Sequence, residues 1–256
     1  MTSPEKRFAN RVAIVTGAGQ GLGATFAMAL AAQGARVVVG DVVSTEATCE
    51  AIRANGGQAA GRHADVTDAA SVRALIGEAR TRYGRLDIVV NNAALSGAID
   101  MTPLTEITTA DWDRVLAVNT RGVFEMIKAA VPVMREQKSG SIINIASGTA
   151  IKGTPGLLHY VASKGAVISI TRAAARELGD DGIRVNCIAP GLVMTDGTRN
   201  NKTWTDAARA ANVASRSLKR DAHPADLIGA LLFLASSDSA FITGQTLAVD
   251  GGSVML

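Results

Sequence analysis

The 256-residue sequence predicts an α/β fold with a doubly wound, parallel sheet of seven strands and helices on both faces. Two observations support this prediction. Short apolar runs rich in β-branched residues alternate along the chain with longer segments of helical character, and a cluster of glycines separates the first apolar run from the first helix. The length suits one domain over residues 1–256 with a full core, and we find no internal repeat or linker.

The composition supports a folded domain with many turns. Apolar residues make up 47% of the chain, aromatic residues make up 4%, and there are 26 glycines. This composition predicts a core of alanine, valine, isoleucine and leucine. The 26 Lys and Arg residues nearly balance the 23 Asp and Glu residues, and no basic run contains interleaved aromatic residues. A nucleic-acid partner is therefore not expected.

Neither end of the sequence carries a recognisable targeting segment. Residues 1–11 lack the apolar stretch of a signal peptide, and the apolar run at 227–235 is too short to span a bilayer. We therefore expect a soluble, cytoplasmic protein with no membrane partner. Cys49 and Cys187 lack the spacing of a disulfide framework or a metal site, so both are expected to be reduced packing residues, with no metal bound.

The first strand is expected at 12–16, followed by a glycine turn and a helix over 24–33. Glycines in such a turn let the backbone approach a pyrophosphate, and the helix N-terminus offers unpaired N–H groups. The spacing is G-x-x-x-G-x-G rather than the usual G-x-G-x-x-G, and a glycine turn alone is a weak signal. Its place between strand and helix favours nucleotide binding, with these candidate contacts: Gly17, Gln20, Gly21, Leu22 and Gly23.

The second strand, at 36–40, ends at Asp41, which lies 41 − 23 = 18 residues beyond the last loop glycine. This is near the distance at which a carboxylate accepts hydrogen bonds from an adenosine ribose. The alternative is that Asp41 only begins a turn. A carboxylate here would also repel the 2′-phosphate of NADP, and neither Gln20 nor Val42 supplies a cation. The sequence therefore favours NAD over NADP.

Two acidic residues follow the segment at 58–63. Asp68 is expected to be the N-cap of a helix over 69–83, whereas Asp65 has no such local role and could face the adenine. The next strand, at 86–90, is closed by four small or polar residues, Asn91, Asn92, Ala93 and Ala94. They suit a turn and a closely passing ligand equally well.

A long helix is expected from about Thr109 to at least Ala130, with a kink or reset at Pro132. Asn119 lies in its middle, and asparagine is an indifferent helix former. It is either an exposed residue with no particular role or a residue with a polar role inside the protein.

The segment from Ser147 to Lys164 carries the strongest chemical signal. Ser147 follows a strand at 142–146, and open α/β sheets place their ligands at the carboxyl ends of strands. Tyr160 and Lys164 lie on one face of a helix that follows Pro155 and Gly156. An ammonium beside a phenol favours the phenolate, which would bring the phenol's pKa toward neutrality and suit acid/base catalysis. The alternative is a chance pair on an amphipathic helix.

The last third of the chain supplies two strands around a polar segment. The strand at 183–189 ends at Pro190 and Gly191, and residues 192–216 are expected to form a mobile substrate loop or lid. A helix at about 224–235 and a strand at 246–249 complete the pattern. The charges of the polar segment permit a neutral or an acidic substrate: Arg199, Lys202, Arg209 and Arg216 against Asp196 and Asp206.

Together these motifs resemble the short-chain dehydrogenase/reductases along nearly the whole chain, with a Rossmann-type fold. The matching pieces are TGAGQGLG (16–23), DV (65–66), NNAA (91–94), Asn119, the serine of NIAS (144–147), YVASK (160–164), PG (190–191) and FITGQTLAVDGG (241–252). Ser147 precedes Tyr160 by 160 − 147 = 13 residues, which is the family's spacing. Two positions depart from the pattern: Ala94 replaces a usual glycine, and Ala146 replaces a frequent second serine.

The resemblance implies a role for each catalytic candidate. Tyr160 would be the acid/base, Lys164 would bind the nicotinamide ribose and lower the phenol's pKa, and Ser147 would orient the substrate oxygen. Asn119 would hold a proton-relay water. The remaining implied cofactor contacts are Asp65 and Val66 at the adenine, Asn92 and Ala93 along the cofactor, Val193 and Thr195 beside the nicotinamide, and also Pro190 and Gly191.

The resemblance also implies a homotetramer built partly from helices around 115–130 and 157–178. The small residues there suit close packing of helices between subunits, although burial within one chain would explain them equally: Ala162, Gly165, Ala166, Ala173 and Ala174.

The function expected from the sequence is an NAD-dependent oxidoreductase acting on a secondary alcohol or ketone. The runner-up is a 3-oxoacyl-thioester reductase of the fatty-acid-synthesis type, which generally uses NADPH, and Asp41 argues against it. A cofactor-binding sensor without turnover is a further alternative, but such proteins typically lose the tyrosine or the lysine.

Overall fold

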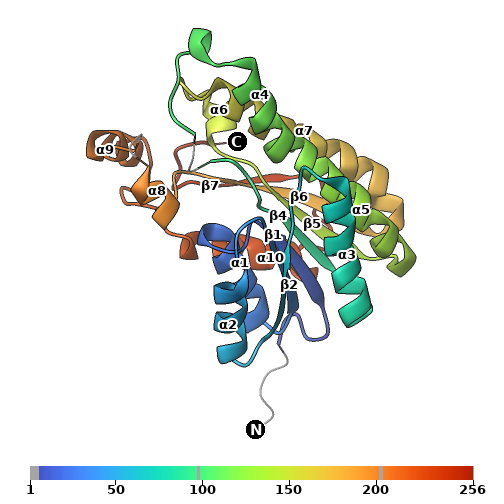
Figure 1. Cartoon of the computed structure of the whole chain (residues 1–256). Helices are drawn as coiled ribbons and strands as arrows, with labels where there is room; N and C mark the ends of the chain where they lie inside the picture. Colours follow the sequence, from blue (N-terminus) through green and yellow to red (C-terminus); the bar gives the residue numbers. More distant parts are fainter. Residues whose placement is uncertain (1–5, 97–98, 202–203, 256) are drawn as a thin grey trace.

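Seven parallel strands form one sheet in the computed structural model, which describes residues 6–96, 99–201 and 204–255 (Figure 1). The strands lie in the order β3-β2-β1-β4-β5-β6-β7. Their bounds are β1 Val12–Thr16, β2 Arg36–Asp41, β3 Gln58–His63, β4 Ile88–Asn91, β5 Gly140–Ile145, β6 Ile183–Pro190 and β7 Thr246–Val249.

The strand order places the start of the chain at the centre of the sheet. The chain runs from β1 outward to β3, returns to β4 beside β1, and then runs outward to β7. The direction of travel therefore reverses between β1 and β4. In open parallel sheets, ligands bind in the crevice beyond the carboxyl ends of the strands at this reversal.

Helices cover both faces of the sheet (Figure 1). One face packs against α3 (Ala69–Tyr83), α5 (Gly122–Gln137) and α7 (Leu158–Leu178), and the other packs against α1 (Gly21–Ala32), α2 (Glu46–Ala54) and α10 (Ala225–Ala235). Both faces of β1 are buried, which explains why its sequence is continuously apolar rather than alternating. The remaining elements are short: η1 Leu104–Glu106, α4 Thr109–Leu116, η2 Ala117–Arg121, α6 Thr149–Lys152, η3 Gly179–Asp181, α8 Asp196–Asn200, α9 Asp206–Ala214 and η4 Ser237–Ser239.

The fold class expected from the sequence is confirmed, and several elements match in detail. The last strand has the expected bounds, and so does α3, where the Asp68 side chain accepts a hydrogen bond from the Ala70 N–H at 2.8 Å. The strands expected at 86–90 and 142–146 lie at 88–91 and 140–145 instead. Cys49 and Cys187 are buried and unpaired, as expected.

The long helix after β4 is interrupted earlier than the sequence suggested. It consists of α4, a π-helical turn η2 and α5, and it runs through Pro132 to Gln137. The expected reset at Pro132 does not end the helix, because the flanking Val131 and Val133 are buried and hold it against the core. The irregular turn lies instead around Asn119.

The segment at 192–216 is more ordered than a plain loop. It contains α8 and α9, whose first turns are capped by the hydroxyls of Thr195 and Thr205. Arg216 is 2% exposed, and its guanidinium donates to Leu192 O and Asn212 Oδ1, so it is not one of the pocket charges expected from the sequence. Lys202, another of those charges, lies outside the described residues.

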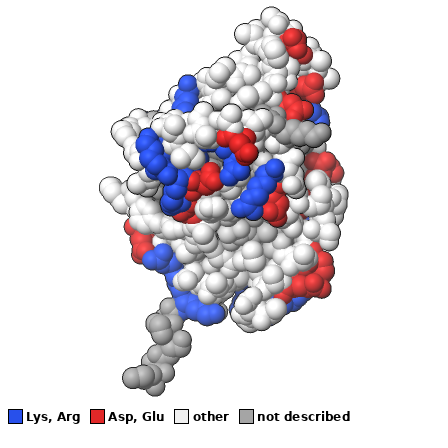
Figure 2. Space-filling view, turned by 90° about the vertical axis from the view of Figure 1, so that its left-hand side faces the viewer, with Lys and Arg blue, Asp and Glu red and all other residues white. Residues whose placement is uncertain are grey.

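Charges on the surface are mixed. On the face that Figure 2 shows, basic and acidic side chains lie near one another rather than in a patch of one sign. Ion pairs between exposed or partly exposed side chains include Arg220 with Asp226, at 2.7 Å. In the part of the chain that the structure describes, no helix is long and apolar enough to cross a membrane.

Candidate active site

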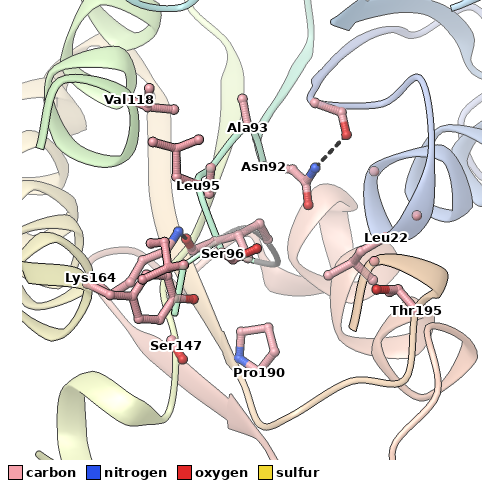
Figure 3. A pocket seen from close by; sticks show the side chains of 18 of the residues that line it. Leu22, Asn92, Ala93, Leu95, Ser96, Val118, Ser147, Lys164, Pro190 and Thr195 are labelled. Carbon is pink, nitrogen blue, oxygen red and sulfur yellow. Dashed lines mark hydrogen bonds between the residues drawn. The ribbon is translucent and has the colours of Figure 1, made fainter. Parts of the chain in front are cut away.

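A cavity of about 990 Å³ lies along the carboxyl ends of the central strands (Figure 3). Ser147, Lys164 and Leu95 lie toward one side of it in this view, and Asn92, Leu22 and Thr195 lie toward the other. Every site residue expected from the sequence lines this cavity except Asn119: Gly17, Gln20, Gly21, Leu22, Gly23, Asp41, Asp65, Val66, Asn92, Ala93, Ser147, Tyr160, Lys164, Pro190, Gly191, Val193 and Thr195.

The glycine turn after β1 has no room for a side chain at Gly17, Gly19 or Gly23. A Cβ at Gly17, where φ is +61°, would lie 2.7 Å from Ala93 Cα, and one at Gly23 would lie 2.1 Å from Gly17 O. The helix α1 begins at Gly21 with no side-chain cap and no acidic residue in its first turn. Its N-terminus is therefore free to take an anion from the cavity, which fits a pyrophosphate group.

Asn92 and Thr16 hold this turn in place. Asn92 Nδ2 donates to Thr16 O at 3.0 Å and to Gly17 O at 2.9 Å. Thr16 Oγ1 accepts from the N–H groups of Asn92 and Ala93, each at 3.1 Å. A bond from Asn92 is drawn in Figure 3. The sequence singled out Asn92 as a candidate contact, whereas Thr16 appeared only as the first residue of the matching segment TGAGQGLG.

The position of Asp41 fits both alternatives that the sequence left open, which are a residue that begins a turn and a contact to the adenosine ribose. Its Oδ1 accepts from the Val43 N–H at 3.2 Å, as in a turn, and its Oδ2 accepts from the Gly19 N–H at 2.8 Å. The carboxylate is 9% exposed and lines the cavity, while the neighbouring Val42 is 56% exposed. A carboxylate held by the glycine turn at the cavity wall fits the hydroxyls of an adenosine ribose.

Asp65 has a local role, contrary to the expectation from the sequence. Its Oδ1 accepts from the Thr67 Oγ1 at 2.7 Å and from the Thr67 N–H at 2.8 Å. Both hydrogen bonds lower the pKa of Asp65, and the bond from the Thr67 hydroxyl has the larger effect. The side chain therefore closes a turn at the cavity wall, a common use of aspartate after a strand.

Tyr160 and Lys164 lie one turn apart near the start of α7. The Lys164 Nζ lies 5.8 Å from the centroid of the Tyr160 ring and donates to Ile145 O at 2.7 Å. The lysine is 3% exposed, although it lines the cavity. Ser147, two residues beyond the end of β5, lines the same cavity, and its hydroxyl lowers the pKa of Tyr160.

The ionisation of this pair differs from the expectation. Burial raises the pKa of Tyr160, and the Ser147 hydroxyl opposes that rise. Burial also lowers the pKa of Lys164 to about 8. The expectation that the ammonium draws the phenol's pKa toward neutrality is therefore wrong for this structure. Burial disfavours the charged form of both groups and is the largest cause of each shift.

Asn119 is a buried polar residue with hydrogen-bond partners. The alternative that it is exposed and has no particular role is wrong. Asn119 is fully buried in the π-helical turn. Its Oδ1 accepts from the Leu95 N–H at 2.7 Å, and its Nδ2 donates to Leu95 O and to Ser163 Oγ, both at 3.1 Å. Ser163 Oγ in turn donates to Tyr160 O at 2.7 Å. Asn119 thus fixes the loop after β4 and the first turn of α7. Ser163 lies within the YVASK segment, but no role for it was expected from the sequence.

Further lining residues that the sequence did not single out surround the catalytic candidates. They mix apolar and polar side chains: Leu95, Ser96, Ile99, Thr149, Lys152, Thr154, Leu157, Leu192, Trp204, Asn212 and Asp250. Their positions depend on how the loops fold over the sheet, so no spacing in the sequence could have marked them.

Comparison with known proteins shows the family. A family model described as enoyl-(acyl carrier protein) reductase, adh_short_C2, matches residues 17–254. The chain belongs to the short-chain dehydrogenase/reductases. This short-chain dehydrogenase/reductase is thus an oxidoreductase of a family that uses a nicotinamide cofactor.

Its relatives at similar identity differ in their named activities. The chain is 39% identical over 246 residues to 3-oxoacyl-(acyl-carrier-protein) reductase FabG of Staphylococcus aureus, covering 95% of this chain and 98% of the relative. It is also 39% identical over 259 residues to "Probable galactose dehydrogenase GalD" of Rhizobium meliloti, covering 98% and 99%. The crystal structure of levodione reductase superposes with a TM-score of 0.91 at 34% identity, covering 96% of this chain and 98% of that one.

Proposed function

We propose that this short-chain dehydrogenase/reductase interconverts a secondary alcohol and a ketone, with NAD(H) as its cofactor. The observation that carries the proposal is one continuous cavity with two ends of different chemistry. The glycine turn and Asp41 line it together with Ser147, Tyr160 and Lys164. When bound, the cofactor supplies hydride exchange at C4 of its nicotinamide.

The residues of the chain handle the proton and the substrate oxygen. In oxidation, the Tyr160 phenolate takes the hydroxyl proton of the alcohol, and in reduction the phenol returns it to the carbonyl oxygen. Ser147 donates a hydrogen bond to the same oxygen and stabilises the charge that develops there. Lys164, held by Ile145 O at 2.7 Å, places a positive charge beside the phenol ring when it is protonated. Asn119 supports the arrangement from behind the cavity wall.

The preference for NAD rests on the charge at the end of β2. Asp41 lines the cavity, and the next side chain, Val42, is uncharged and 56% exposed. A 2′-phosphate placed against Asp41 would bring two like charges together. Hydroxyl groups of an unphosphorylated ribose would instead donate charge-assisted hydrogen bonds.

The test is a comparison of cofactors and substrates with the purified protein. We expect NADH formation from at least one secondary alcohol in a panel such as cyclohexanol, 1-phenylethanol and galactose, with kcat/KM at least about tenfold higher for NAD than for NADP. Tyr160→Phe should lose at least about a hundredfold in kcat while its dissociation constant for NADH stays within about twofold. A variant that keeps more than about a hundredth of the activity would show that Tyr160 is not the acid/base.

A second candidate function is reduction of a 3-oxoacyl thioester. It is favoured by the names of relatives such as FabG of Staphylococcus aureus, which is 39% identical. Acetoacetyl-coenzyme A is a suitable probe. Faster reduction of this thioester with NADPH than of any simple ketone with NADH would favour the second candidate over the first.

We also propose that the protein is a homotetramer assembled partly through α5 and α7. Ala173 on α7 is exposed, and Ala162, Gly165, Ala166 and Ala174 are only partly buried. Burial within one chain therefore does not account for all of this small-residue surface. Phe124 on α5 and Leu158 on α7 are 49% and 46% exposed, which adds apolar area to the same two helices.

A further inference from the structure

Thr149 lies two residues beyond Ser147 and makes two contacts with it. The Thr149 Oγ1 donates to Ser147 Oγ at 2.9 Å, and the Thr149 N–H donates to the same oxygen at 3.2 Å. Thr149 lines the cavity, while Ser147 is 7% exposed. No role for Thr149 was expected from the sequence.

The hydrogen-bonding capacity of Ser147 makes these contacts informative. A serine hydroxyl has two lone pairs and one proton. Both lone pairs of Ser147 are used by Thr149, so its proton is the group that remains for the cavity. A hydroxyl held in this state can donate to the Tyr160 oxygen or to a substrate oxygen, but it has little capacity to accept from either.

We propose that Thr149 is a positioning residue that keeps Ser147 a hydrogen-bond donor toward Tyr160 and the substrate oxygen, and thereby favours the phenolate that takes the proton from the alcohol. This inference rests on the function proposed above, because it assigns a direction to a hydrogen bond in that mechanism.

Removing the threonine hydroxyl has a defined electrostatic consequence. The Ser147 hydroxyl lowers the pKa of Tyr160 against the larger effect of burial, which raises it. With one lone pair free, the Ser147 oxygen can accept a hydrogen bond from the neutral phenol instead. A hydrogen bond of that direction stabilises the protonated form, so the pKa of Tyr160 rises further.

The test uses the isosteric variant Thr149→Val and the conservative variant Thr149→Ser. For alcohol oxidation with saturating NAD, we expect the pH profile of kcat in Thr149→Val to move to higher pH by about half a unit to one unit. Activity near neutral pH should fall about 3- to 10-fold. Thr149→Ser keeps the hydroxyl and should retain the profile of the original protein.

Two controls separate this role from a merely structural one. Thr154→Val removes another threonine hydroxyl from the cavity wall and should leave the pH profile in place. In a Ser147→Ala background, Thr149→Val should produce no further shift, because Thr149 acts through the serine. Superimposable profiles for the original protein and Thr149→Val, or an equal shift with and without Ser147, would overturn the proposal.

A second measurement does not depend on turnover. The chain has two tyrosines, so Tyr83→Phe leaves Tyr160 as the one phenol that titrates in the ultraviolet. Thr149→Val in that background should raise the midpoint of phenolate formation, and Thr149→Ser should not. Equal midpoints would contradict the proposal even if an alcohol substrate is found. If no alcohol is oxidised, the proposed function fails while this titration still decides the role of Thr149.

Discussion

The ammonium group of Lys164 is buried, so its charge lowers the free energy of unfolding, and this loss can be measured. The side chain is 3% exposed, and its pKa in the folded protein is lowered to about 8 by burial. In the unfolded chain the pKa is near 10.5. Between these values the unfolded protein binds more protons than the folded one, so this group makes the free energy of unfolding rise with pH.

Lys164→Met should therefore stabilise the folded protein while it abolishes turnover. At pH 7 the variant has no buried charge at this position. Its free energy of unfolding should therefore exceed that of the original protein, and this difference should shrink by about 3 kcal/mol as pH rises from about 8 to about 10.5. Urea unfolding of both proteins across this pH range checks the expectation. A difference in the free energy of unfolding that does not change with pH would mean that burial does not lower the pKa of Lys164. Lys164 is then a residue of the proposed catalytic site that lowers the stability of the folded protein.

Asp41 and Val42 determine cofactor choice in the proposed function. Asp41→Ala combined with Val42→Arg removes the repulsion of a 2′-phosphate and adds a phosphate partner at a position that is 56% exposed. The ratio of kcat/KM for NAD to that for NADP should fall by at least about tenfold. Asp41→Ala alone is the matched control, since both variants lose the bond to the Gly19 N–H. An unchanged ratio in the double variant would mean that Asp41 does not contact the ribose.

Among the helices and strands, the π-helical turn η2 is the element most closely tied to the site. A single wide turn moves Asn119 into the interior, where it bonds to both backbone groups of Leu95 and to Ser163. Such turns are rare inside helices and occur frequently at functional sites. Here the wide turn connects α4 and α5 to the cavity wall and to α7.

Asn119→Leu keeps the side-chain size but leaves the N–H and C=O of Leu95 without this partner. We expect the free energy of unfolding to fall by about 2–4 kcal/mol, because each buried unsatisfied group costs about 1–3 kcal/mol. Asn55→Leu is the control, since Asn55 is exposed and bonds only to a helix carbonyl nearby. Urea unfolding checks both variants. A loss in Asn119→Leu that is no larger than in Asn55→Leu would contradict the structural role of the turn.

Elements with strong local signals could be predicted from the sequence, and those that depend on tertiary contacts could not. Asp68 marked the start of α3 because its side chain caps the helix within the same segment. The π-helical turn was missed because its residue Asn119 bonds to Leu95, which lies 24 residues away along the chain. The same limit applies to the site. The spacing of Tyr160 and Lys164 was readable, but the direction of their pKa shifts depends on burial, which only the folded chain determines.

At the scale of the whole molecule, the proposed tetramer depends on helix surfaces that one chain leaves uncovered. Gly165 lies on α7, and a Cβ placed there would meet no atom of the described residues within 4 Å. A side chain at this position should therefore be tolerated by a single chain. Between two copies packed closely through α7, the same side chain would have no room.

Gly165→Arg should accordingly dissociate the tetramer without unfolding the chain. Gly77→Arg on α3 is a matched control, since Gly77 is also a helical glycine with open space at its Cβ, but it lies outside the proposed interface. Sedimentation analysis should give about four times the chain's mass for the original protein and Gly77→Arg, and a smaller assembly for Gly165→Arg. The circular dichroism of the three proteins should be alike. A Gly165→Arg protein that remains a tetramer would exclude α7 from the interface, and a monomeric original protein would refute the assembly itself.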